Sequence, residues 1–221
     1  MTNETNGQAA ATAAAPAPLP PGGAPRHDQA GSALSPHHTL LIRTAKVVGR
    51  NGQALCIIRD ASAEEVRIKR FTPLPPGPEL AIELPDGQRH AVVQVWEDGD
   101  QAGLRFVEPV ALERLIAANP AHLRKREISL DCLVPGVLSA RSGECDVKLH
   151  DISQHGARIE CGLHLAMNER VRLETQTLPP LMATIAWRRA PFYRLLFDRV
   201  FAFDELARLS GVVGPPPPPI G

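Results

Sequence analysis

The feature that most constrains the fold of this chain is an internal repeat at an offset of 91 residues. The segment DASAEEVRI at 60–68 aligns without a gap with DISQHGARI at 151–159. The same offset superimposes both tryptophans of the chain and two further apolar pairs: Trp96 and Trp187, Leu104 and Leu195, Phe106 and Phe197. Self-similarity at a fixed period is typical of repeated structural units, so the chain is expected to contain two homologous domains.

The repeat divides the chain into four parts. Two domains are predicted at 37–118 and 122–210. Residues 1–36 are rich in Ala, Pro and Gly and have no apolar periodicity. Such a segment buries too little apolar surface to offset its ordering entropy, so a disordered tail is expected. Residues 211–221 form a Pro-rich tail that is either solvated or, as a polyproline II helix, recognised by a partner.

The pattern within each domain is β. The first domain contains six short runs rich in apolar and β-branched residues, and turn signals such as Asp86-Gly87 separate them. Six short antiparallel strands favour a closed barrel, which leaves no strand edge exposed. Runs with helical spacing follow at 109–119 and 201–209. The predicted fold class is therefore all-β: two tandem six-stranded antiparallel barrels, each followed by a short helix, with disordered tails at both ends.

Charge and hydropathy limit the partners. Lys plus Arg and Asp plus Glu both count 24, so the formal net charge is zero. A duplex-DNA binder usually carries a basic excess, so no DNA partner is expected. No apolar run approaches the ~18 residues of a membrane helix, and no signal peptide opens the sequence. We therefore expect a cytoplasmic protein without a membrane span.

The chain carries no recognisable catalytic or metal motif. Its four cysteines contain no Cys-x-x-Cys pair and are expected to be reduced, buried thiols. The adjacent His37 and His38 lack a third ligand nearby. Asp151, Ser153 and His155 lie too close together in one short run to converge as a hydrolytic triad. The chain is expected to be no enzyme, with neither a cofactor nor a metal.

An Asp-x-Ser-x-x-Gly motif opens the repeated segment. The motif is complete at 151–156, whereas at 60–65 the glycine is replaced by Glu65. Further along, each copy has its Trp and then a closing strand, GLRF at 103–106 and RLLF at 194–197. This combination resembles the PilZ family, whose domains are β-barrels that in many members bind the bacterial second messenger cyclic di-GMP.

The resemblance implies a ligand site in the second domain. Arg124 and Arg126 would lie in an arm before the first strand and contact guanine and phosphate, which a guanidinium engages with forked hydrogen bonds. Asp151, Ser153 and Gly156 would frame a guanine on the barrel surface, the glycine allowing close approach of the backbone.

The first domain carries degenerate equivalents of this site, namely His37, Asp60, Ser62 and Glu65. The 91-residue offset places no arginine of the first copy at the positions of the arm. We therefore expect the ligand at the second domain. Because the first copy carries Glu65, the fold is expected to tolerate a glutamate at Gly156.

Plainer interpretations stay open for each feature. The cations at 124–126 also suit a solvated linker, and Asp151 with Ser153 also suits a self-contained turn. Trp96 and Trp187 are expected to be core residues rather than stacking platforms. Two functions follow: a receptor or effector of cyclic di-GMP, or a degenerate adaptor that binds no nucleotide and acts through contacts with an unknown protein partner.

Overall fold

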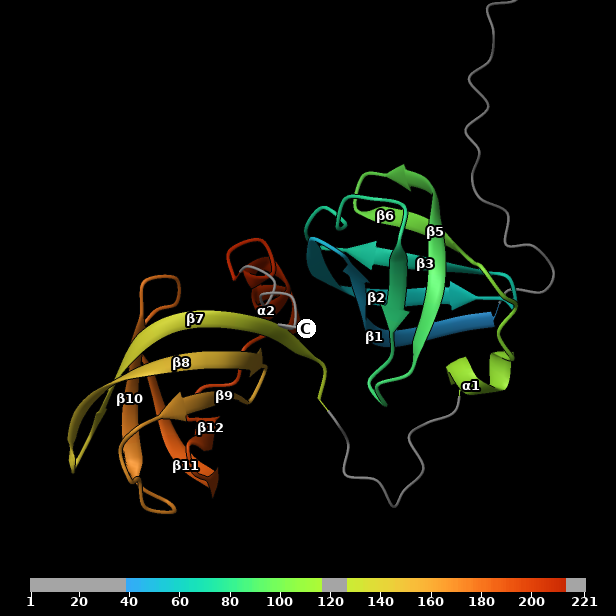
Figure 1. The fold of residues 1–221 in the computed structure, drawn as a ribbon. Helices are drawn as coiled ribbons and strands as arrows, with labels where there is room; N and C mark the ends of the chain where they lie inside the picture. Colours follow the sequence, from blue (N-terminus) through green and yellow to red (C-terminus); the bar gives the residue numbers. More distant parts are fainter. Residues whose placement is uncertain (1–38, 117–126, 214–221) are drawn as a thin grey trace, which may run out of the picture. The chain divides into compact units, whose positions relative to one another are not determined.

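The computed structural model describes residues 39–116 and 127–213. Within the first range, six antiparallel strands close into a barrel in the order β1-β2-β3-β6-β5-β4 (Figure 1). The elements are β1 (Thr39–Gly49), β2 (Gly52–Ala61), β3 (Glu65–Arg70), β4 (Leu80–Glu83), β5 (Arg89–Asp98), β6 (Gln101–Phe106) and the helix α1 (Leu112–Ile116).

The second range forms another closed barrel with the same topology. Its strands follow one another around the barrel as β7-β8-β9-β12-β11-β10, the order of the first barrel with each label raised by six. The elements are β7 (Ser129–Ala140), β8 (Gly143–Ser153), β9 (Gly156–Cys161), β10 (Arg170–Thr175), β11 (Leu181–Arg189), β12 (Phe192–Phe197) and the helix α2 (Phe203–Leu209). The predicted fold class of two six-stranded antiparallel barrels is confirmed.

The inward side chains of the two barrels repeat position by position. Apolar residues alternate with outward polar ones along the strands, as a filled barrel interior requires. Four aligned pairs are at most 1% exposed: Ile58 and Leu149, Ile68 and Ile159, Ile82 and Leu173, Leu104 and Leu195. The repeat found in the sequence is therefore largely a repeat of the barrel core.

The predicted turn and helices are present. Gly87 has a φ of 88° in the hairpin between β4 and β5, and the carboxylate of Asp86 accepts a hydrogen bond from the backbone N–H of Gln88 at 2.9 Å. Helix α2 falls within the predicted run, and α1 occupies the described part of its own run. In 39–116 and 127–213, no helix is long and apolar enough to cross a membrane.

Both tryptophans lie on the outer surface, so the expectation that they are core residues is wrong. Trp96 is 37% exposed and Trp187 is 47% exposed. The strand register shifts between Gln94 and Trp96 in β5, and between Ile185 and Trp187 in β11. The extra residue of such a β-bulge breaks the two-residue alternation, so the indole ring ends on the outer face.

The predicted domain boundaries, 37–118 and 122–210, stay predictions. The tail at 1–36 lies outside the described residues. So do residues 214–221 of the second tail, while the preceding Val213 is buried.

Candidate ligand-binding site

The complete motif of the second barrel forms the turn between β8 and β9. Asp151 and Ser153 end β8, where the register shifts between Leu149 and Asp151, and Gly156 begins β9. The Ser153 hydroxyl is buried and donates a hydrogen bond to the carbonyl of Gly156 at 3.1 Å. This short-range bond closes the turn and fixes the hydroxyl oxygen beside the carboxylate of Asp151.

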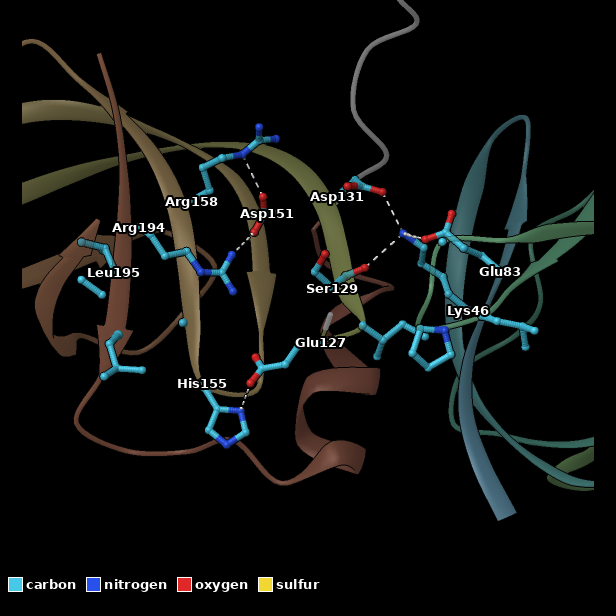
Figure 2. Close-up of a pocket in the computed structure, with 17 residues that line it drawn as sticks. Lys46, Glu83, Glu127, Ser129, Asp131, Asp151, His155, Arg158, Arg194 and Leu195 are labelled. Carbon is cyan, nitrogen blue, oxygen red and sulfur yellow. Dashed lines mark hydrogen bonds and ion pairs between the residues drawn. The ribbon is translucent and has the colours of Figure 1, made fainter. Parts of the chain in front are cut away.

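Two arginines from neighbouring strands hold the carboxylate of Asp151 (Figure 2). Arg194 of β12 donates from Nη1 to Oδ1 at 2.8 Å and from Nη2 to the Ser153 hydroxyl at 3.0 Å. Arg158 of β9 places Nε 2.9 Å from Oδ2. Two cations therefore contact one carboxylate that is only 12% exposed.

The pairing of β9 with β12 brings these arginines together. Arg158 and Arg194 stand directly opposite each other in the ladder, and Trp187 of β11 stands opposite Arg194 from the other side. Side chains opposite each other in a sheet share one face. The arginines, the indole ring and the motif thus lie on one outward surface of the barrel.

His155 lies in the turn of the motif but does not engage its serine. The imidazole Nδ1 is 2.6 Å from a carboxylate oxygen of Glu127 (Figure 2). The Ser153 hydroxyl instead contacts Gly156 and Arg194. This geometry lacks the base aimed at a hydroxyl that nucleophilic catalysis requires.

Gly156 is required by strand packing. A Cβ atom added there would lie 2.0 Å from the carbonyl oxygen of Leu195 on β12. That oxygen belongs to the backbone and cannot rotate away as a side chain would. The expectation that this position tolerates a glutamate is therefore wrong: the close approach of β12 at Gly156 leaves no room for a side chain.

The first barrel keeps the turn but not the arginine pair. Asp60 is buried, with Oδ2 3.2 Å from Nε of Arg67, the equivalent of Arg158. The Ser62 hydroxyl accepts a hydrogen bond from the N–H of Glu65 at 3.0 Å, and the Glu65 side chain lies beside Arg105 on the surface.

At the position of Arg194 the first barrel has Gly103. A Cβ atom at Gly103 would lie 2.1 Å from the indole nitrogen of Trp96, so the ring covers this glycine. The outward face of the first barrel is thereby filled by an aromatic ring where the second barrel presents a guanidinium.

The structure brings Asp151, Ser153 and Gly156 together as the sequence predicted. Arg124, Arg126 and His37 lie outside the described residues. Sequence reasoning missed Arg158 and Arg194. The first could have been found, because it aligns with Arg67 within the repeat. Arg194 aligns with Gly103 and not with another arginine. Only the pairing of β12 with β9 shows which groups it contacts.

The described residues, 39–116 and 127–213, contain no group of three or more side chains suited to hold a metal ion. Their four cysteines carry free thiols.

The family model of the PilZ domain matches residues 121–200, which include all the described site residues of the second barrel. No curated protein sequence matches the chain.

The solved structures to which the chain is similar include three bacterial proteins. Borreliella burgdorferi PlzA in complex with c-di-GMP has 12% identity and a TM-score of 0.32, covering 76% of this chain and 87% of its own. Bacillus subtilis MotI/DgrA, an inhibitor of motility, has 14% identity and a TM-score of 0.34, with 78% and 95% covered. Escherichia coli YcgR in complex with c-di-GMP has 11% identity and a TM-score of 0.28, with 78% and 82% covered.

Proposed function

Because residues 121–200 are a PilZ domain, we propose that this chain is a receptor or effector of cyclic di-GMP that binds the dinucleotide at its second barrel. One observation carries the proposal: Asp151 and Ser153 present two acceptor oxygens to the same planar donor group, on a surface where two arginines meet. A guanine base with its phosphate needs that combination of acceptors and cations.

The acceptors suit the edge of guanine that carries N–H groups. Asp151 offers a carboxylate oxygen and Ser153 offers a hydroxyl oxygen, and guanine has two adjacent donors, N1–H and the 2-amino group. Hydrogen bonds to a charged acceptor are the stronger kind. Arg158 approaches Asp151 through Nε and is 47% exposed, so its charge is available to a phosphate of the ligand.

The first barrel is a weaker candidate at each of these points. Glu65 adds a negative charge to the turn of the first barrel, where the second barrel has Gly156. The resemblance to the PilZ family also supplies Arg124 and Arg126 as additional cations before the second barrel and none before the first. We therefore assign the ligand to the second barrel alone, and we propose that the chain acts by binding rather than by catalysis.

Calorimetric titration of the full chain with cyclic di-GMP tests the proposal. Asp151→Ala should weaken binding at least about tenfold, since a hydrogen bond to a charged group contributes about 1.5–3 kcal/mol. Asp60→Ala is the matched control, because Asp60 also pairs with an arginine at the equivalent bulge, and it should leave the affinity unchanged. A wild-type chain that gives no binding heat, or equal losses in both variants, would overturn the proposal.

A degenerate adaptor that binds no nucleotide is the second candidate. The observation that favours it is that Arg194 already donates to both acceptors of the motif. Such an adaptor would bind a protein partner through the barrel surface, where Met182, Trp187 and Leu196 on β11 and β12 are exposed apolar side chains. The same titration separates the two candidates, since an adaptor of this kind gives no heat.

A further inference from the structure

Arg194 stands where the first barrel has a glycine, and its side chain ends on the two oxygens that the proposed ligand needs. Nη1 donates to Asp151 Oδ1 at 2.8 Å (Figure 2), and Nη2 donates to Ser153 Oγ at 3.0 Å. The contact is partly buried, with 36% of the Arg194 side chain and 12% of the Asp151 side chain exposed. Two nitrogens of one planar group thus engage the whole recognition edge of the motif.

The chemistry of this contact matches that of the base. In guanine, N1, C2, N3 and the exocyclic N2 form a guanidine unit, and N1–H and N2–H point in one plane from adjacent nitrogens. A guanidinium offers the same pair of donors from Nη1 and Nη2. Arginine and guanine would therefore compete for Asp151 and Ser153 with like geometry.

We propose that Arg194 is an internal competitor of cyclic di-GMP: it fills the guanine subsite of the free protein and must leave when the dinucleotide binds. This inference rests on the proposed function. The affinity of the chain is then reduced by the fraction of molecules whose subsite is open, because only these can accept the base. Arg194 thereby sets the concentration of ligand to which the chain responds.

The rest of the site does not depend on Arg194. Without this arginine, Asp151 keeps Arg158 at 2.9 Å from Oδ2. Ser153 keeps its bond to the carbonyl of Gly156 at 3.1 Å. Neither buried group is orphaned, so the motif should hold its shape when Arg194 is removed.

The first barrel shows the local structure when the position equivalent to Arg194 carries no side chain. There Gly103 leaves room beside the motif, and the indole ring of Trp96 takes it. Trp187 stands opposite Arg194 in the same register. An Arg194→Gly chain is therefore expected to fold.

Titration of three full-length variants with cyclic di-GMP tests the inference. Arg194→Gly and Arg194→Met should each bind at least about tenfold more tightly than the wild type, if about one molecule in ten is open before binding. The methionine variant keeps a long apolar stem while losing all donors, so it covers the case that the glycine variant unfolds. Arg199→Gly is the control: it removes a cation that pairs with Glu205 just beyond β12, and it should not strengthen binding.

Each outcome is decisive. Tighter binding by either Arg194 variant than by a wild type that binds supports the inference. Weaker or unchanged binding by folded variants, with a wild type that binds, would mean that Arg194 assists the ligand or is indifferent to it; this overturns the inference and leaves the proposed function standing. No binding by any of the chains overturns both.

Discussion

The two barrels agree in their interior and differ in one row of outward residues. Their strand orders match, and their β-bulges recur at equivalent places, including the bulges that precede Asp60 in β2 and Asp151 in β8. Their buried side chains repeat at the same offset. Both interiors therefore support the same barrel, and the difference that concerns the candidate site lies in outward residues.

Each barrel has one glycine beside the motif, but the two glycines occupy different positions in the repeat. The first barrel has Gly103 on the closing strand, under an indole ring, and Glu65 in the turn. The second has Gly156 in the turn, against the Leu195 carbonyl, and Arg194 on the closing strand. In one copy the small residue admits an aromatic ring, and in the other it admits the neighbouring backbone. The first arrangement places an indole ring over the closing strand, and the second places a guanidinium there.

Exchanging the turn residues should produce the largest effect. Gly156→Glu forces a side chain against the backbone of β12, so we expect a loss of about 3 kcal/mol, at the upper end for overpacked sites. Glu65→Gly removes a surface ion pair and adds backbone freedom, which should cost about 1 kcal/mol or less. Chemical denaturation of the full-length variants measures both losses. Equal losses would show that the two turns are alike after all.

Much of the fold was predictable because its signals are local. Alternating apolar runs and turn dipeptides such as Asp86-Gly87 specify strands and hairpins without long-range information. The tryptophans were placed wrongly because a bulge shifts the face of a strand by one residue, and nothing local marks Gln94 or Ile185 as its position.

The site was predictable only in part. Asp151 and Ser153 lie in one recognisable motif, and the turn brings them together. Arg194 lies on another strand, and its contact depends on the register of β12 against β9. The sequence suggested that Gly156 allows a ligand to approach closely. In the structure its neighbour is the backbone carbonyl of Leu195, which no sequence pattern reveals.

A smaller effect should follow from giving the first barrel the arginine of the second. Gly103→Arg places a side chain where the indole of Trp96 now lies, so the ring must move outward. We expect a loss of about 1–3 kcal/mol, as for other overpacked sites, and a red-shifted emission of Trp96. The measurement uses a Trp187→Phe background, so that one indole reports. An unshifted spectrum would mean that the ring does not depend on the glycine.

The smallest effect concerns the thiols, which differ between the barrels in exposure but not in acidity. Burial raises the pKa of Cys56 in the first barrel to about 12. It also raises the pKa of Cys145 in the second to about 12, and the adjacent thiol of Cys161, 3.0 Å away, adds to the shift. Alkylation needs the thiolate, so both thiols should react slowly near neutral pH while their barrels stay closed.

The two thiols differ clearly in access. Cys56 is fully buried, while Cys145 is partly exposed. Iodoacetamide should therefore modify Cys145 first in the native chain, and Cys56 only through opening of its barrel. Peptide mass spectrometry over time separates the two sites, with Cys145→Ser as the control for assignment. Equal rates would mean that the first barrel opens readily, and that its interior, although it repeats that of the second, is the less stable of the two.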